Sequence, residues 1–257
     1  MLIVISPSKR MDIDKSTPPF YTIPKFIEEA QVLNKKLRTI SKKKLGILMK
    51  INKEIAQLNV ERNHEWCPPF TPDNAKTAIH LFQGDVYLGL NAIDFAESDL
   101  EFAQKSLRIL SGLYGLLLPL DLIQPYRLEM GTSLKVRRKN NLYEYWGDKI
   151  TTELNQSFQE QSDSDRVLIN LASNEYFKSI NAKKLNAPVI TPSFKEQRGD
   201  ALKVIGFVAK KNRGLMSRYI IKNRITSAED IKSFDWEGYQ YDPKISTETD
   251  WVFVRSS

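Results

Sequence analysis

The chain has 257 residues, of which 41% are hydrophobic and 27% are charged. Twelve Phe, ten Tyr and four Trp residues supply enough apolar surface to offset the entropy of ordering the chain, which excludes a disordered protein. The formal net charge of +7 favours anionic partners such as nucleic acid, nucleotides or acidic lipid, without deciding between them.

In chain order, the first expected element is a buried strand at residues 2–5, an apolar run closed by Ser-Pro. Residues 25–38 and 41–60 carry apolar side chains at helical spacing and predict two amphipathic helices. Thr71-Pro72 is typical of a helix start, and residues 98–101 fit a capping box.

The second half of the chain mixes strands and helices in the same way. Expected strands are residues 167–171, 189–191, 204–208 and 251–254, and expected helices are residues 173–180 and 213–222. No repeat or Gly/Ser linker divides the chain. We therefore expect one compact domain over residues 1–257, an α/β (mixed α+β) fold with a mixed sheet flanked by helices.

The compartment follows from cysteine usage and from the N-terminus. Cys67 is the single cysteine and cannot form an internal disulfide, and no basic and apolar leader opens the sequence. The apolar run at residues 113–120 is too short to span a bilayer. These features predict a cytoplasmic protein without a membrane partner.

The basic residues are concentrated in two segments that contain no acidic residue. Residues 30–53 hold eight Lys/Arg, and residues 201–228 hold seven. In the second segment Lys211, Arg218 and Lys222 fall near one helical face, which fits either a polyanion contact or a solvated helix surface. The role of the basic segment 35–53 stays open, and surface solubility is the interpretation that we favour.

Ligands of α/β sheets bind beyond the carboxyl ends of the strands, so the residues after the first strand are candidates, Lys9 above all. Paired glycines mark the middle of the chain at Gly112-Leu113-Tyr114-Gly115. This pattern predicts a tight hairpin between two helices, where glycine lets backbone N–H groups approach a phosphate closely. Two other interpretations stay open, an ordinary turn and a strand at residues 108–113.

Longer motifs resemble the YaaA peroxide-stress family, and they keep their order over nearly the whole chain. The matching stretches are Ser6–Lys9, Gly84–Leu90, Leu107–Gly131, Leu142–Asp148, Leu171–Phe177 and Ala209–Met216. The resemblance implies a protein that limits peroxide damage linked to free iron and binds DNA through a basic cleft and a helix-hairpin-helix element. It also implies an unusual α/β fold, and it names no cofactor.

The expected DNA contacts combine this resemblance with the charge pattern. They are Lys9, the hairpin residues Gly112, Leu113, Tyr114 and Gly115, and the cations Arg127, Lys210, Lys211, Arg213 and Arg218. One departure from the family block is Leu118, where a basic residue is usual. Binding of this kind depends mostly on phosphates, so we expect weak sequence specificity.

An enzyme that acts on DNA bases or nucleotides is the alternative. Asp85, Glu129 and Glu175 are carboxylates within otherwise apolar motifs and, together with Lys9, could act as acid, base or nucleophile. The same carboxylates could instead cap helices or pair with arginines, and we favour that structural interpretation.

A metal site was considered because of the link to iron. His64, Cys67 and His80 are all the His and Cys residues of the chain, and His64 and Cys67 have a ligand-like spacing. A closed structural site would need a fourth ligand. We therefore expect no metal and no other cofactor.

Overall fold

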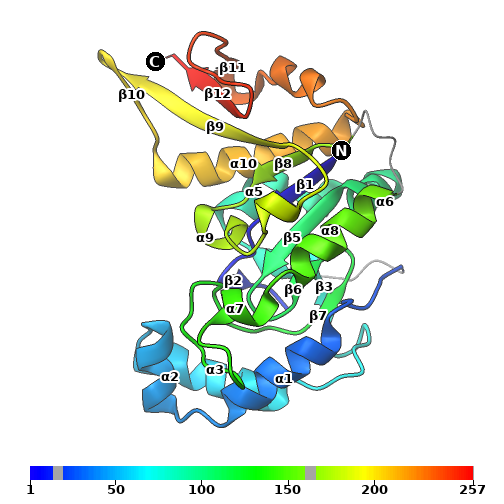
Figure 1. Cartoon of the computed structure of the whole chain (residues 1–257), viewed down its shortest axis with the longest axis vertical. Coiled ribbons are helices and arrows are strands. Elements are labelled where there is room, and N and C mark those ends of the chain that lie inside the picture. The colour runs from blue at the N-terminus through cyan, green and yellow to red at the C-terminus, as the bar shows by residue number, and fades with distance from the viewer. Residues whose placement is uncertain (14–19, 160–165, 257) are drawn as a thin grey trace.

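The computed structural model describes residues 1–13, 20–159 and 166–256, and a mixed sheet of eight strands forms its centre (Figure 1). The strands are β1 (Leu2–Ile5), β5 (Leu107–Ser111), β6 (Gly115–Leu117), β8 (Leu168–Leu171), β9 (Val189–Arg198), β10 (Ala201–Lys203), β11 (Tyr239–Tyr241) and β12 (Asp250–Arg255). Their order is β11-β12-β9-β8-β1-β5-β6, and β10 pairs with β9. This arrangement confirms the expected mixed α/β fold.

The helices that the described residues form are α1 (Ile27–Arg38), α2 (Lys42–Met49), α3 (Lys53–Glu65), α4 (Ala78–Leu81), α5 (Asp85–Leu90), α6 (Glu97–Ser106), α7 (Leu142–Trp146), α8 (Lys149–Gln159), α9 (Asn174–Phe177) and α10 (Gly206–Lys222). Single 3-10 turns are η1 (Ala92–Asp94), η3 (Ala182–Lys184), η4 (Glu229–Ser233) and η5 (Trp236–Gly238). Two small two-stranded sheets join β2 (Arg10–Met11) to β4 (Phe82–Gln83) and β3 (Lys76–Thr77) to β7 (Leu122–Ile123).

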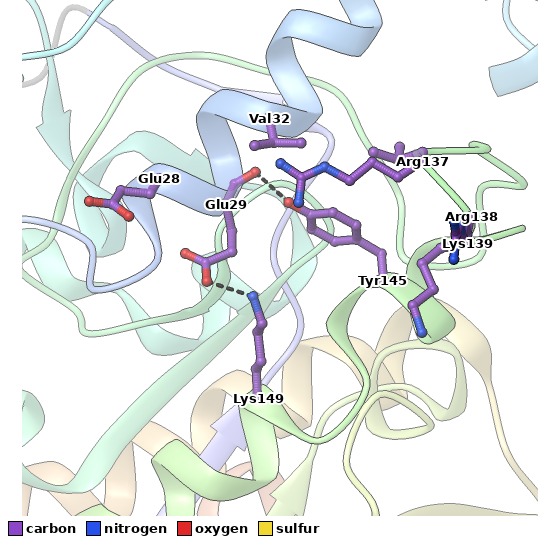
Figure 2. Close-up of a pocket in the computed structure, with 9 residues that line it drawn as sticks. Glu28, Glu29, Val32, Arg137, Arg138, Lys139, Tyr145 and Lys149 are labelled. Carbon is purple, nitrogen blue, oxygen red and sulfur yellow. Dashed lines mark hydrogen bonds and ion pairs between the residues drawn. The ribbon is translucent and has the colours of Figure 1, made fainter.

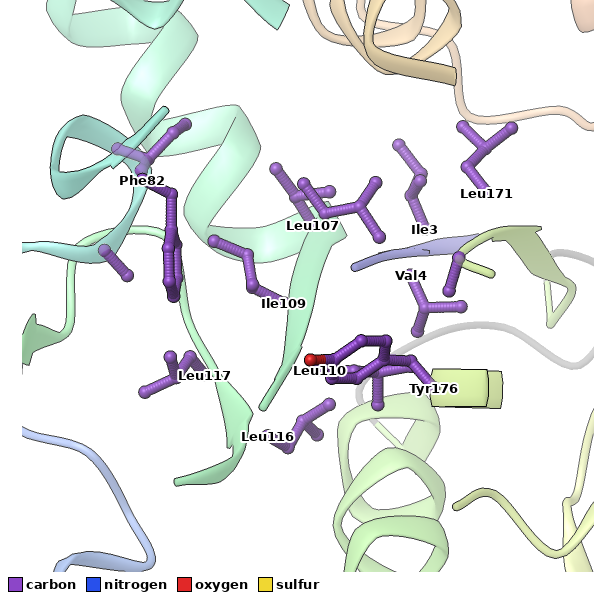
Figure 3. Packing of buried hydrophobic residues seen from close by; sticks show 14 of the residues in the cluster. Ile3, Val4, Phe82, Leu107, Ile109, Leu110, Leu116, Leu117, Leu171 and Tyr176 are labelled. Atoms are coloured by element: carbon purple, nitrogen blue, oxygen red, sulfur yellow. The ribbon is translucent and has the colours of Figure 1, made fainter. Parts of the chain in front are cut away.

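The central strand β1 is buried along its whole length, as its continuous apolar run predicts. It pairs in parallel with β5 on one side and with β8 on the other. Helices α6 and α10 contact β1, while α8 contacts β6 and α9 contacts β5. Figure 3 shows the resulting packing, in which Ile3 and Val4 lie among side chains of β5, β6 and β8. A strand so enclosed positions the residues that follow it.

Three expectations about secondary structure need correction. Residues 41–60 form two helices, because Lys50 adopts a left-handed conformation with φ 53° between α2 and α3. Residues 204–208 are not a strand, since Gly206 already begins α10, which extends to Lys222. Thr71-Pro72 starts a turn whose Thr71 carbonyl accepts from Asn74 N at 3.1 Å, and no helix follows it.

The expected hairpin between helices at Gly112–Gly115 is also wrong. These residues form the turn of an antiparallel β-hairpin between β5 and β6. The Ser111 hydroxyl accepts from Tyr114 N at 3.0 Å and closes the turn. The strand interpretation of residues 108–113 prevails because the Ile109–Ser111 stretch pairs with β6 and lies in the core.

The helices α1, α2 and α3 lie together at one end of the molecule, at the bottom of Figure 1. Helix α3 packs against both α1 and α2. Arg38 of α1 ties the end of α3 in place, since its guanidinium donates to the carbonyl oxygens of Asn63 and Trp66 at 2.7 and 2.8 Å. This helical end is separate from the C-terminal strands β9 to β12 at the opposite end (Figure 1).

Candidate functional site

The carboxyl ends of β1 and β8 are held together by serine hydrogen bonds. The Ser6 hydroxyl, directly after β1, accepts from Ser173 N at 2.9 Å. Tyr87 of α5 donates its hydroxyl proton to the Ser6 carbonyl at 3.2 Å. Parallel sheets place ligands beyond such strand ends, so the next residues of the chain define a first candidate site.

Lys9 and Arg127 converge at this edge on one carboxylate. Lys9 Nζ lies 2.7 Å from Glu129 Oε2, and Arg127 Nη2 lies 3.4 Å from Glu129 Oε1. The Lys9 side chain is 58% exposed and the Arg127 side chain 16%. The structure thus brings together the two candidate cations Lys9 and Arg127, with one negative charge between them.

A small hollow of about 10 Å³ lies at this edge, enough for roughly one water molecule. Its lining is Pro7, Ser8, Lys9, Tyr126, Arg127, Leu128, Glu129 and Tyr176. Burial raises the pKa of the Tyr126 and Tyr176 phenols well above the ordinary value. Both phenols therefore remain neutral at physiological pH and form uncharged walls.

The three candidate catalytic carboxylates have different surroundings. Glu129 is shared by Lys9 and Arg127, and Glu175 Oε1 accepts a hydrogen bond from Gly131 N at 2.8 Å. Asp85 stands in the first turn of α5, where a negative charge is favoured by the helix dipole. Two of the three carboxylates thus have structural partners at this edge.

The glycine hairpin cannot reach a phosphate from its position. Residues Gly112 to Gly115 are buried, and a Cβ atom on Gly112 would lie 2.1 Å from the Leu128 carbonyl oxygen. Trp146 covers Gly115 and donates its indole N–H to the Gly112 carbonyl at 3.1 Å. The glycines at these two positions serve close packing rather than ligand contact.

Helices α2 and α3 are joined by a tight turn in another part of the chain. Lys50 takes the left-handed conformation, and Ile51 N donates to the Gly46 carbonyl at 3.0 Å. Asn52 then caps α3, its side-chain oxygen accepting from Ile55 N at 2.9 Å. Buried Ala56 lies 3.7 Å from the place of a Cβ on Gly46. Small residues at these positions let the two helices approach closely.

Exposed lysines surround this α2–α3 hairpin. They are Lys42, Lys43, Lys44, Lys50 and Lys53. No carboxylate in the described ranges forms an ion pair with any of them. A hollow of about 650 Å³ lies beside the turn, lined by Lys42, Lys43, Gly46, Ile47, Ile51, Asn52, Lys53 and Ala56. The hairpin therefore presents unneutralised positive charge around a concave surface.

Helix α10 carries the second basic segment, but most of its cations have internal partners. Arg218 pairs with Asp94 at 2.7 Å, and Lys211 pairs with Glu237 at 2.5 Å. Lys222 and Arg224 both pair with Asp99, at 2.6 and 2.8 Å. These four cations hold α10 and the turn that follows it against other parts of the protein.

Two candidate cations of α10 are not paired in this way. Lys210 is exposed, and Arg213 is half-buried, which lowers the pKa of its guanidinium. Neither forms an ion pair with a carboxylate that the structure describes. Lys210 and Arg213 thus keep charge available, unlike Lys211 and Arg218.

A further basic hollow of about 590 Å³ lies between α1 and the loop at residues 136–139 (Figure 2). Arg137, Arg138 and Lys139 lie on its loop side, while Lys149 of α8 pairs with Glu29 of α1 at 2.6 Å. The Tyr145 hydroxyl donates to the Glu29 carbonyl at 2.9 Å. Burial, then the Glu29 carboxylate, raises the pKa of Tyr145 to about 12.

The candidate metal ligands do not form a cluster. His80 Nδ1 lies 2.7 Å from the Thr77 hydroxyl, and the exposed thiol of Cys67 lies 3.4 Å from the Pro68 carbonyl. Across the residues described, no group of three His, Cys, Asp or Glu side chains is arranged to hold a metal ion.

Sequence reasoning missed the α2–α3 hairpin and the loop cations. For the hairpin, the signal was the apolar spacing around Lys50-Ile51-Asn52, with Gly46 and Ala56 at the small positions. For the loop, it was the run of four cations in residues 135–139. Neither pattern contains a pair of glycines, which is the feature from which the hairpin was predicted.

No helix in the described ranges has the length and hydropathy to cross a membrane. The family model of the peroxide stress protein YaaA matches residues 1–245. A UPF0246 protein of Colwellia psychrerythraea strain 34H is 52% identical over 257 residues, covering 99% of both chains. A UPF0246 protein of Marinomonas sp. strain MWYL1 is 49% identical and covers 99% of this chain and 97% of its own length. The chain therefore belongs to the YaaA peroxide stress protein family.

Proposed function

We propose that this protein acts in peroxide stress by binding DNA, and that the α2–α3 hairpin is its main phosphate contact. The observation that carries the proposal is the pair of helices joined at a left-handed Lys50 and ringed by five lysines without ion-pair partners among the described carboxylates. In this proposal, residues 42–65 are the helix-hairpin-helix element that the family resemblance implies.

The chemistry of the hairpin fits a phosphate. The first turn of any helix leaves backbone N–H groups without intrahelical acceptors, and in α3 the Asn52 cap uses one of them, Ile55 N. A phosphate near the start of α3 would meet the remaining N–H groups and the positive end of the helix dipole. Lys50 and Lys53 flank this point in the sequence.

Two other groups extend the proposed surface. Lys9 and Arg127 lie at the carboxyl edge of the sheet, and Lys210 and Arg213 lie on α10. Contacts of this type read the DNA backbone and not the bases, so the protein should bind many sequences. Any lowering of free iron is part of the proposal only as a consequence of DNA or protein binding.

Fluorescence anisotropy of labelled duplex and bubble DNA across a NaCl series tests the proposal. Lys53→Ala should weaken binding and reduce the slope of log K against log salt by about 1. The matched control is Lys183→Ala, an exposed lysine of η3 without an ion-pair partner among the described carboxylates. A wild-type affinity that does not depend on salt, or an equal slope for Lys53→Ala and wild type, would contradict the proposal.

A nucleotide-processing enzyme is the second candidate, favoured by the contact of Lys9 with Glu129 beyond the end of β1. Against it, Glu129 and Glu175 already have structural partners. Mass spectrometry after incubation with free nucleotides or with DNA containing damaged bases decides between them. Turnover that Glu129→Gln or Asp85→Asn abolishes would replace the binding proposal with catalysis.

A further inference from the structure

None of the proposed DNA contacts lines the hollow between α1 and the loop at residues 136–139. Its volume of about 590 Å³ lies within the range of roughly 300–1,000 Å³ that small-molecule sites occupy. Its walls come from distant parts of the chain, since Val32 lies on α1, Val136 in the loop and Tyr145 on α7. A hollow of this size between separate elements can hold a small molecule.

Two polar contacts fix the wall of the hollow that faces the loop. The Tyr145 hydroxyl donates to the Glu29 carbonyl at 2.9 Å, and the Glu29 carboxylate pairs with Lys149 of α8 at 2.6 Å (Figure 2). Because the pKa of Tyr145 is raised to about 12, its phenol is neutral at pH 7. The hollow thus has a wall that is held in place and that presents an uncharged aromatic ring.

The opposite wall is a tight turn that carries three cations. Val136 N and Lys139 N each donate to the carbonyl oxygen of the other residue at 3.0 Å, which leaves Arg137 and Arg138 at the tip. Arg137 has a φ of 55°, a left-handed conformation that is uncommon for a side chain of this size. Arg137, Arg138 and Lys139 all line the hollow. The turn therefore brings three positive charges to one side of it.

These three cations have no ion-pair partner among the carboxylates of residues 1–13, 20–159 and 166–256. The carboxylates that line the hollow are those of Glu28 and Glu29. Glu29 is engaged by Lys149, and Figure 2 shows Glu28 on the side of Glu29 that is away from the loop. The cations of the turn are thus available to an anionic ligand.

The charges around the hollow indicate the type of anion. Four cations and two carboxylates line it, which leaves a net charge of +2. Lys135 and Glu144 lie next to the turn without lining the hollow, and their charges cancel. A phosphomonoester carries about −1.5 to −2 at pH 7, and guanidinium groups bind phosphate oxygens in pairs. A phosphomonoester therefore matches this site.

The uncharged walls indicate what the phosphate is attached to. Val32, Val136 and Tyr145 present apolar surface to the hollow. Inorganic phosphate or a sugar phosphate would leave this surface in contact with water, whereas a nucleobase would cover it with its own flat, largely apolar face. Bases in a DNA duplex are stacked on each other and cannot enter such a hollow. The walls thus favour a free nucleotide.

We propose that this hollow binds a nucleoside monophosphate, with Arg137 and Arg138 at the phosphate and Val32, Val136 and Tyr145 around the base. The site is separate from the proposed DNA contact at the α2–α3 hairpin, whose lysines line a different hollow. It gives the protein a second ligand, a small molecule, whose binding does not depend on DNA.

Isothermal titration calorimetry with the monophosphates of adenosine, guanosine, cytidine and uridine tests the inference. Inorganic phosphate and ribose 5-phosphate are the probes without a base, and the four nucleosides are the probes without a phosphate. At least one monophosphate should bind about tenfold more tightly than all of these probes. Arg137→Met and Arg138→Met should each weaken its binding by about tenfold, because methionine keeps an apolar stem and removes the guanidinium.

Lys53→Ala is the matched control, an exposed cation that does not line this hollow. It should keep the nucleotide affinity and reduce the salt slope of DNA binding, whereas Arg137→Met should do the reverse. The inference is overturned if no monophosphate binds at about 1 mM, if inorganic phosphate binds equally well, or if both arginine variants keep the wild-type affinity. A reduced DNA salt slope for Arg137→Met would assign the turn to the DNA surface and would also overturn it. Absence of salt-dependent DNA binding would contradict the proposed function alone.

Discussion

The two basic segments look alike in the sequence and differ in the folded protein. Both lack acidic residues over more than twenty positions. In α10, Lys211, Arg218 and Lys222 meet carboxylates from other elements, whereas the lysines of α2 and α3 meet none in the described ranges. Charge along a sequence therefore does not show which cations are free for a partner.

The difference arises from where each helix lies. Helix α10 crosses α5 at very short range, and its side chains reach Asp94 and Asp99 beyond α5. Helices α2 and α3 lie at the end of the molecule, where they pack against each other and α3 also packs against α1. A helix that packs among other elements contacts their carboxylates. The basic side chains of a helix at the end of the molecule stay exposed to solvent or to a ligand.

The largest expected effect concerns the crossing that positions α10. A Cβ on Gly214 would lie 1.8 Å from the Val86 carbonyl oxygen, so Gly214→Ala must separate α10 from α5. Overpacking of this kind should lower the free energy of unfolding by about 3 kcal/mol. Urea unfolding measures it, with Gly206→Ala as the control because nothing lies within 4 Å of that Cβ position. Equal urea midpoints for the two variants would contradict close packing of α10 against α5.

Asp121 lies outside both basic segments, and its buried carboxylate should make the stability of the protein depend on pH. Asp121 is 1% exposed, and burial raises its pKa to about 6. A raised folded-state pKa means that protonation favours the folded protein, so stability should increase by about 2 kcal/mol as the pH falls from about 6.5 to 4. Asp121→Asn should lack this increase in urea unfolding at several pH values. The prediction fails if both proteins change equally over that range.

The stability that Asp99 contributes should depend on pH in the opposite direction. Its carboxylate pairs with Lys222 and Arg224 at the C-terminal end of α10. Hydrogen bonds from Lys222 and Arg224 outweigh the effect of burial and lower its pKa to about 2. A lowered pKa stabilises the folded protein above pH 4, and this contribution is lost as the pH falls through 2. Asp99→Asn should cost about 2 kcal/mol at pH 7. Asp148→Asn, at an exposed pair with Lys184, is the control for surface charge.

The smallest effect compares the two segments directly. Arg218→Ala removes the pair with Asp94 and should lower stability while leaving the salt slope of DNA binding unchanged. Lys42→Ala should do the reverse, with unchanged stability and a slope reduced by about 1. Thermal unfolding and anisotropy are measured on the same preparations. A reduced slope for Arg218→Ala would add Arg218 to the DNA contacts and remove the distinction.

Part of the candidate site was predictable from the sequence. Lys9 was expected at the end of the first strand, and it lies there beside Arg127, paired with Glu129. The turn at 112–115 was assigned to the wrong pair of elements because a turn between helices and a turn between strands can both use a glycine at positive φ, as Gly115 is here.

The sequence alone determined the elements whose apolar pattern fits only one type of secondary structure. The four apolar residues of β1 and the apolar run of β12 form strands, as their sequences predict, and the net charge of +7 already favoured an anionic partner. The tertiary structure decided the rest. It divided residues 41–60 at Lys50, began α10 at Gly206, and determined which of the basic residues have carboxylate neighbours. Counter-charges come from residues distant in sequence, so only the fold distinguishes a structural cation from one that is free to bind.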